Sequence, residues 1–172
     1  MKKFLLPLLF LCLFILESLF VQYVPSDLFG HNKIIAPHFL FTALLFLTIF
    51  VGRKPGIIYA AIFGLLFDIV YIEIIGIYLF LFPFVAYLAS KILNILQNNF
   101  LVAMVITIVG NALLEIGAYE MDHLIHVTDI DFLTYLNLRF YPTLILNAIF
   151  VMIAGYPLKR LFEKHIEAIR AE

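Results

Sequence analysis

Cysteine, tryptophan and charged residues are scarce in this sequence. Its 172 residues include one cysteine, Cys12, and no tryptophan, and only 13% of them are charged. A single cysteine excludes an intrachain disulfide and a zinc site made of several thiolates, and we expect its thiol to be buried. Soluble domains carry roughly a quarter charged residues, so this chain lacks the surface of a soluble protein. The net charge of −1 gives no indication of nucleic-acid binding.

The common sequence motifs of catalysis are also missing. The chain has no H-E-x-x-H, G-x-S-x-G or P-loop motif, and "GLLFD" at 64–68 differs from the G-x-G-D of intramembrane aspartyl proteases. His123 and His126 have a spacing that could hold a metal on a helix, but the polarity of the surrounding loop accounts for both. The sequence therefore predicts no enzyme, no cofactor and no metal site.

Apolar residues are abundant: 65% of the chain is hydrophobic, and the mean hydropathy is +1.09. A transmembrane helix needs about 20 apolar residues. We therefore predict an all-α, polytopic membrane protein with a single integral membrane domain over 1–172 and a short amphipathic cytoplasmic tail at 159–172. The first span is expected to stay uncleaved, because no small-residue cleavage site follows it. The six predicted transmembrane helices are 4–24, 35–51, 56–71, 74–90, 100–119 and 141–158.

The basic residues predict the orientation of these spans. Short cytoplasmic loops are enriched in lysine and arginine, and six spans place both termini on the same side. With both termini cytoplasmic, only Lys33 and Arg139 lie outside, and the polar stretch 120–139 is an external loop. The other nine basic residues lie inside: Lys2, Lys3, Arg53, Lys54, Lys91, Lys159, Arg160, Lys164 and Arg170.

The stretch "GLLFDIVYIEIIG", from Gly64 to Gly76, carries Asp68 and Glu73 between two apolar runs. The segment 56–90 is short for two spans and a turn, which need more than about 40 residues. Asp68 would lie about 18 Å along its helix, at a depth where a carboxylate needs a partner. It could accept from backbone N–H groups at the start of the next helix, or belong to an ion or substrate site. We interpret the stretch as a structural joint, with Gly76 supplying a positive φ.

Four further polar residues interrupt the predicted spans: Glu17, Asn111, Glu115 and Asn147. Asn111 and Glu115 are four residues apart and therefore share one helix face. Such groups are expected to point into the bundle. They could make interhelical hydrogen bonds, or Glu17, Asp68, Asn111 and Glu115 could form an outward-facing pocket that binds a ligand.

At the expected start of the second span, Pro37 would be the first residue of the helix. His31 and His38 lie on either side of it in the sequence. We interpret both histidines as residues of the membrane interface.

Taken in order, these pieces resemble the MreD family of bacterial rod shape-determining membrane proteins over essentially the whole chain. The most specific piece is G-L-x-x-D…G at Gly64, Leu65, Asp68 and Gly76. Others are Glu17-Ser18, "APHFL" with Pro37, "YLASK" at 87–91, "LLE" with Glu115, and "RFYPTLILN" with Arg139, Pro142 and Asn147.

The resemblance implies a non-enzymatic protein of the bacterial cytoplasmic membrane that maintains cell shape. It would bind MreC within the elongation machinery and help position or regulate side-wall peptidoglycan synthesis. MreB and the elongation polymerase and transpeptidase would be indirect partners.

The resemblance also implies a fold similar to the S-components of energy-coupling-factor transporters. The alternative function is therefore an S-component-like subunit that binds a small molecule such as a vitamin. S-components carry small alanine-type residues on their first span, whereas "FLLPLLFLCLFILESLF" at 4–20 has no alanine or glycine.

Overall fold

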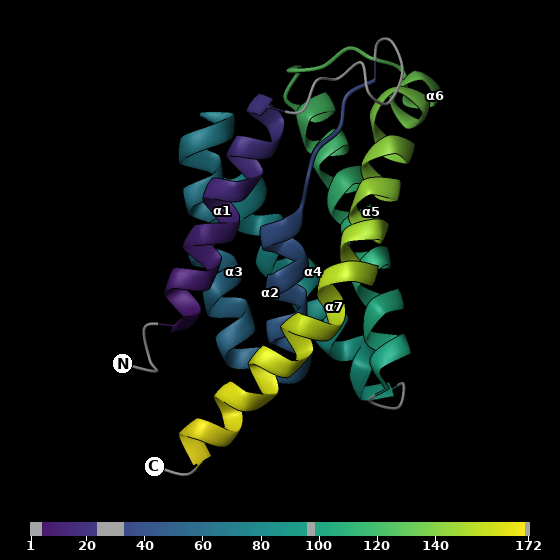
Figure 1. The fold of residues 1–172 in the computed structure, drawn as a ribbon. Helices are drawn as coiled ribbons and strands as arrows, with labels where there is room; N and C mark the ends of the chain where they lie inside the picture. Colours follow the sequence, from purple (N-terminus) through teal and green to yellow (C-terminus); the bar gives the residue numbers. More distant parts are fainter. Residues whose placement is uncertain (1–4, 24–32, 96–98, 171–172) are drawn as a thin grey trace.

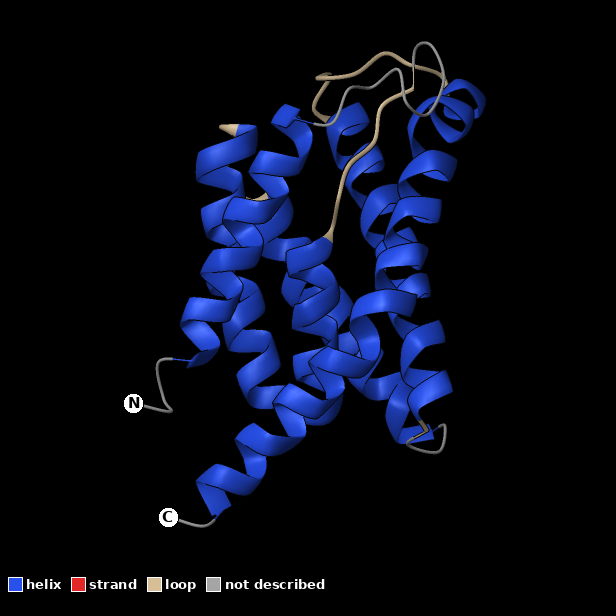
Figure 2. Ribbon diagram, in the orientation of Figure 1, coloured by secondary structure: helices blue, strands red, loops and turns tan. Residues whose placement is uncertain are grey.

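The computed structural model describes residues 5–23, 33–95 and 99–170, and every regular element within them is helical (Figures 1 and 2). Lys2, Lys3 and His31 lie outside the described residues. In chain order the elements are α1 (Leu5–Tyr23), α2 (Phe39–Phe50), α3 (Arg53–Phe67), the π-helical turn η3 (Asp68–Ile72), α4 (Ile77–Ile95), α5 (Phe100–Leu124), α6 (Phe132–Tyr135), the π-helical turn η4 (Leu136–Phe140) and α7 (Tyr141–Arg170).

Four helical stretches are long and apolar enough to cross a membrane: Leu6–Tyr23, Arg53–Ile72, Phe100–Leu124 and Phe132–Ala168. Two further apolar helices are shorter, Phe39–Phe50 and Ile77–Leu93. The six apolar helices follow the order of the six predicted spans. Length and composition thus support a membrane protein with four full-length candidate spans.

Helix α2 is shorter than predicted and lies at the centre of the bundle. The second span was predicted to begin at residue 35, but segment 33–38 is not helical and the helix begins only at Phe39. Pro37 accounts for the loss of residues 35 and 36, because a proline disfavours helical geometry in the residue before it. The expectation that Pro37 itself is the first residue of the helix was also wrong, since the helix begins two residues later. The side chains from Phe39 to Ile49 are all buried, and α1, α3, α4, α5 and α7 all contact α2 (Figure 1).

The predicted external loop at 120–139 is mostly helical, which corrects the sequence analysis. Only 125–131 separates α5 from α6. Asp131 begins α6 by accepting the backbone N–H of Thr134 at 3.0 Å, and bonds from the Thr134 hydroxyl and N–H hold the pKa of its carboxyl below the usual value. Tyr119 stacks on Tyr135 with ring centroids 4.2 Å apart. This aromatic contact holds together the helices that extend beyond the apolar run.

The predicted C-terminal tail continues α7 without a break at residue 159. Leu158 and Phe162 are buried, and Phe162 stacks on Phe10 of α1 with ring centroids 6.4 Å apart. Figure 1 shows this part of α7 slanting towards the N-terminal end of α1. The first turns of the predicted tail therefore pack on the chain's own bundle. Cys12, expected to be buried, is exposed on α1.

Candidate functional site: a buried polar network beside a cavity

Asp68 caps the N-terminus of α4, the next helix along the chain. Its Oδ1 accepts the backbone N–H of Tyr78 at 2.8 Å, and its Oδ2 accepts those of Gly76 at 2.8 Å and Leu79 at 3.0 Å. The Asp68 side chain is fully buried. A carboxylate at a helix N-terminus satisfies N–H groups that have no partner inside the helix and complements the helix dipole. Of the two roles considered for Asp68, its hydrogen bonds thus match the first, acceptance from backbone N–H groups at the start of the next helix.

Two glycines allow the α3–α4 hairpin to close around Asp68. Gly76 has a φ of 129°, in the positive range that favours glycine. A Cβ on Gly64 would collide with the carbonyl oxygen of Tyr78 and would lie 3.1 Å from the Cα of Leu79. The backbones of α3 and α4 therefore touch at the level where Asp68 bonds to α4.

Glu17 and Asn147 perform the equivalent task for α2. Glu17 Oε1 accepts the backbone N–H of Leu40 at 2.8 Å, and Asn147 Oδ1 accepts that of His38 at 2.7 Å. Asn147 Nδ2 also donates to the carbonyl of Ala36 at 3.1 Å. Glu17 comes from α1 and Asn147 from α7, so two distant helices together hold the buried start of α2. Pro142 lies in the first turn of α7, beside Thr143, whose hydroxyl accepts the backbone N–H of Ala36 at 3.0 Å.

Glu115 on α5 is the centre of a buried polar network. Its carboxylate lies 2.6 Å from His38 Nε2 and accepts from Arg139 Nε at 3.1 Å and Nη2 at 3.3 Å. The hydroxyl of Tyr135 donates to Glu115 Oε2 at 2.9 Å. His38, predicted at the membrane interface, is only 2% exposed. Arg139 was predicted in an external loop, yet it reaches inward from η4 to Glu115.

Asn111, one turn before Glu115 on the same face of α5, contacts a different helix. Its Nδ2 donates to the hydroxyl of Thr42 at 3.0 Å, which joins α5 to the first turns of α2. Both side chains are buried. Asn111 therefore makes an interhelical hydrogen bond, as the simpler interpretation of the sequence expected.

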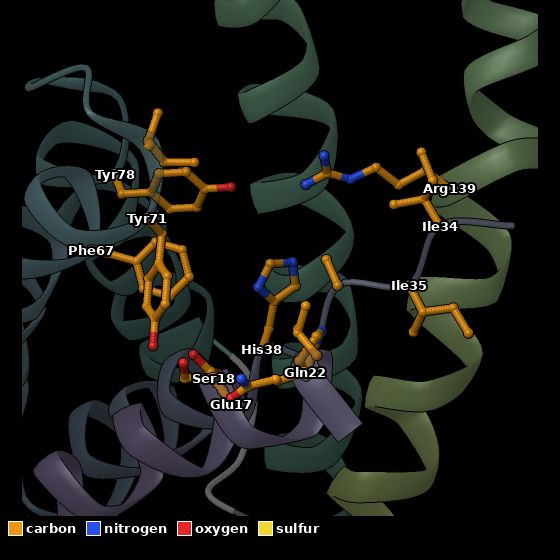
Figure 3. A pocket seen from close by; sticks show the side chains of 14 residues that line it. Glu17, Ser18, Gln22, Ile34, Ile35, His38, Phe67, Tyr71, Tyr78 and Arg139 are labelled. Carbon is orange, nitrogen blue, oxygen red and sulfur yellow. The ribbon is translucent and has the colours of Figure 1, made fainter. Parts of the chain in front are cut away.

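A cavity of about 570 Å³ lies beside this network, between α1, the extended segment 33–38, η3 and the start of α4 (Figure 3). Glu17, His38 and Arg139 are among its lining residues. Of the four residues predicted to form a polar pocket, only Glu17 lines this cavity. The other three bond elsewhere: Asp68 to the start of α4, Asn111 to Thr42, and Glu115 to His38 and Arg139.

Two residues that line the cavity each have one buried atom without a hydrogen-bond partner within the described part of the chain. These atoms are Glu17 Oε2 and His38 Nδ1. The cavity wall also includes aromatic and aliphatic side chains, those of Phe67, Tyr71, Tyr78, Ile34 and Ile35. An apolar cavity with a few free polar atoms is the usual form of a small-molecule site, so this arrangement is suited to binding.

Sequence comparison gives matches over almost the whole chain. The model of the MreD family, described as rod shape-determining protein MreD, matches residues 2–165. The rod shape-determining protein MreD of Bacillus subtilis (strain 168) is 34% identical over 172 residues, covering 100% of both chains. The cell shape-determining protein MreD of Streptococcus pneumoniae (strain ATCC BAA-255 / R6) is 28% identical over 157 residues, covering 91% of this chain and 93% of the relative. No solved structure matches the chain at a significant level.

Proposed function

Because the chain belongs to the MreD family of rod shape-determining proteins, we propose that it is a non-enzymatic membrane component of the cell-elongation complex. In this role it binds an MreC-like protein and helps position or regulate side-wall peptidoglycan synthesis. MreB and the elongation polymerase and transpeptidase are then indirect partners. The observation that carries the proposal is the family match along almost the full chain, which supports a role in cell shape.

We also propose six spans with both termini in the cytoplasm of a bacterial cell. The four long candidate spans and the two shorter apolar helices are consistent in number with this topology. Nine of the eleven basic residues then lie on the cytoplasmic side, as the positive-inside rule requires. A helix shorter than the bilayer thickness can still contribute a crossing where neighbouring protein surrounds it, which is the situation of α2.

The polar network supports a scaffold, because it ties the helices into one fixed arrangement. Glu17, Glu115 and Asn147 each join elements far apart in the sequence, and Asp68 fixes the start of the next helix, α4. A partner is then bound by helix faces that the bundle holds rigidly. Candidate faces carry exposed apolar side chains, such as Ile62 on α3, Val105 on α5 and Ile153 on α7.

One observation favours the second candidate function, an S-component-like subunit of a small-molecule transporter. The 570 Å³ cavity lies in the size range of ligand pockets, which is roughly 300–1,000 Å³. The family match ranks this candidate below the scaffold.

The test is a mild-detergent pull-down from native membranes with mass spectrometry of the recovered proteins. Photo-crosslinking residues at Ile62, Val105 and Ile153 would show which helix face is occupied, and a crosslinker at the buried Val151 serves as the matched control. Recovery of an MreC-like protein and wall-synthesis enzymes, with crosslinks from one face, is expected. Recovery of paired ATPases and a coupling subunit would instead establish the transporter.

A further inference from the structure

Two basic side chains meet at one aromatic ring, at the end of the α3–α4 hairpin away from its turn. The guanidinium carbon of Arg53, the first residue of α3, lies 4.2 Å from the centroid of the Tyr87 ring on α4. The ammonium nitrogen of Lys91, one turn further along α4, lies 5.8 Å from the same centroid. Both distances are within the range of a cation–π contact. One ring therefore brings together positive charges from two helices.

These two charges have no acidic partner in the described part of the chain. Arg53 and Lys91 are absent from the ion pairs that its residues form. Lys54 adds a further positive charge in the first turn of α3, and that turn has no acidic residue. The positive end of a helix dipole disfavours cations and favours anions. This end of the hairpin therefore carries an excess of positive charge that an anion would balance.

Another basic side chain beside aromatic rings shows the contrast. The ammonium nitrogen of Lys159 on α7 lies 5.8 Å from the ring centroid of Phe50 and 5.5 Å from that of Phe100. It also pairs with the carboxylate of Glu163, one turn further along the helix, at 3.7 Å. The charge of Lys159 thus has a partner within the chain. Arg53 and Lys91 are the better candidates for an anion from outside it.

The contact with Tyr87 leaves hydrogen-bond donors available. A guanidinium has five N–H donors and an ammonium has three, and an aromatic ring contacts the charge without using them all. The Arg53 and Lys91 side chains are both exposed. Arginine binds phosphate oxygens through paired N–H donors, and lysine binds them as a point charge. The pair is therefore suited to a phosphate group.

The face of α4 that carries Lys91 continues as exposed aromatic surface. Phe80, Phe84, Tyr87 and Lys91 follow one another at spacings of four, three and four residues, which places them on one face of the helix. Phe80 and Phe84 are 51% and 45% exposed, and their rings stack with centroids 5.3 Å apart. In a bilayer this surface contacts hydrocarbon. A molecule with an anionic head group and a hydrocarbon tail matches the whole face.

The charge indicates which class of lipid fits. Phosphatidylcholine carries its own cation and has no net charge, whereas phosphatidylglycerol has one net negative charge. Basic pockets between membrane helices are known sites for anionic head groups. Two cations without an acidic partner favour the anionic lipid over the zwitterionic one. A free phosphate ion would meet the same charges but would leave the aromatic face unused.

We propose that Arg53 and Lys91 bind the phosphate of an anionic phospholipid, with Tyr87 positioning the two side chains and an acyl chain lying along Phe84 and Phe80. This site requires only that α3 and α4 lie in a bilayer. It does not depend on the proposed role in cell shape, and it adds a lipid ligand to the scaffold.

The test uses the full chain in nanodiscs that contain equal amounts of phosphatidylglycerol and phosphatidylcholine with identical acyl chains. Native mass spectrometry then measures which lipid stays on the released protein. We expect phosphatidylglycerol to be retained at least about tenfold over phosphatidylcholine, equivalent to ~1.4 kcal/mol. Arg53→Gln and Lys91→Gln change exposed side chains and should each lower this preference at least about threefold. Lys164→Gln removes an exposed lysine from α7 and is the matched control, which should keep the preference.

A pair of substitutions at Tyr87 tests the positioning role of the ring. Tyr87→Phe keeps an aromatic ring and should keep the preference for phosphatidylglycerol. Tyr87→Leu removes the ring while both charges stay, and should lower the preference. A Tyr87→Leu variant that retains the wild-type preference would overturn the role assigned to Tyr87.

Inorganic phosphate added to nanodiscs of phosphatidylcholine alone distinguishes a lipid from a soluble anion. It should leave the unfolding temperature unchanged, whereas phosphatidylglycerol added to the same nanodiscs should raise it. A phosphate effect equal to that of the lipid would overturn the proposal in favour of a soluble ligand. Equal retention of the two lipids would also overturn it. So would a Lys164→Gln loss as large as that of Arg53→Gln, because the attraction would then be spread over all basic residues.

Discussion

Removing the Asp68 carboxylate should destabilise the folded protein more than any other single substitution near the α3–α4 turn. Asp68→Leu leaves the backbone N–H groups of Gly76, Tyr78 and Leu79 without their acceptor. A buried donor left unpaired costs about 1–3 kcal/mol. Three such donors correspond to about 3–6 kcal/mol, since losses within one network are not additive. This is a large part of the roughly 5–15 kcal/mol that stabilises a typical domain.

Asp68→Asn tests the assignment of the individual oxygens. An asparagine keeps one carbonyl oxygen, which can still accept from Tyr78, but its amide NH₂ faces the N–H groups that Oδ2 now serves. We expect a loss of about 2–4 kcal/mol, smaller than that of Asp68→Leu. Glu73→Gln, at an exposed position of the same turn, is the matched control and should change stability by less than about 0.5 kcal/mol.

The assay is thermal unfolding of the detergent-solubilised variants, together with their abundance in membranes. Taking about 2–4 °C per kcal/mol for a chain of this size, Asp68→Leu should lower the midpoint by at least about 6 °C. A midpoint within about 2 °C of the wild type for Asp68→Leu would refute the reasoning. It would mean that water or a shifted backbone satisfies the start of α4 without the carboxylate.

Three further substitutions test the neighbouring contacts. Gly64→Ala should lower the unfolding midpoint through a loss of about 1–3 kcal/mol, because its methyl group would meet the backbone of α4; an unchanged midpoint would contradict that close contact. Gly76→Ala should cost about 1–2 kcal/mol through its φ of 129° alone, since no atom lies within 4 Å of the added methyl, and calorimetry showing no loss would contradict the strain. Arg139→Ala should lower the unfolding midpoint through a loss of about 3–5 kcal/mol, because it removes the guanidinium that neutralises Glu115 and leaves that carboxylate with only its contacts to His38 and Tyr135. Glu115→Gln combined with Arg139→Ala should recover part of the loss; a double variant no more stable than Arg139→Ala would argue against the ion pair.

The hairpin around Asp68 was predictable because its constraints are local in sequence. The expectation that both helices fit within 56–90 was wrong, because the first helical stretch runs from Arg53 to Ile72 and α4 continues to Ile95. An aspartate between two apolar runs nevertheless needed nearby donors. The next helix start supplies such donors a few residues later. The joint could therefore be expected from hydropathy and from the general rule that buried polar groups are paired.

The partners of Glu115 were not predictable in the same way. His38 is 77 residues from Glu115 in the sequence, and no local pattern connects the two positions. Arg139 lies next to a stretch rich in acidic and polar residues, so composition placed it in a loop. One signal was available: an apolar helix that contains a glutamate needs a cation or donors from another helix, and Arg139 is one of only two basic residues on the external side of the predicted topology.

The cavity follows from the short length of α2. A helix of 12 residues spans about 18 Å, whereas the hydrocarbon core of a bilayer is about 30 Å thick. The extended segment 33–38 fills only part of the remaining length, and at such depth irregular backbone is tolerated only inside protein or beside a cavity. Ile34 N–H donates to the carbonyl of Leu138 at 3.0 Å, and Ala36 and His38 bond to α7, so one edge of the segment is satisfied by neighbouring helices. Its other side lines the cavity. The interruption that makes Glu17 a helix cap therefore also leaves the space that the cavity occupies.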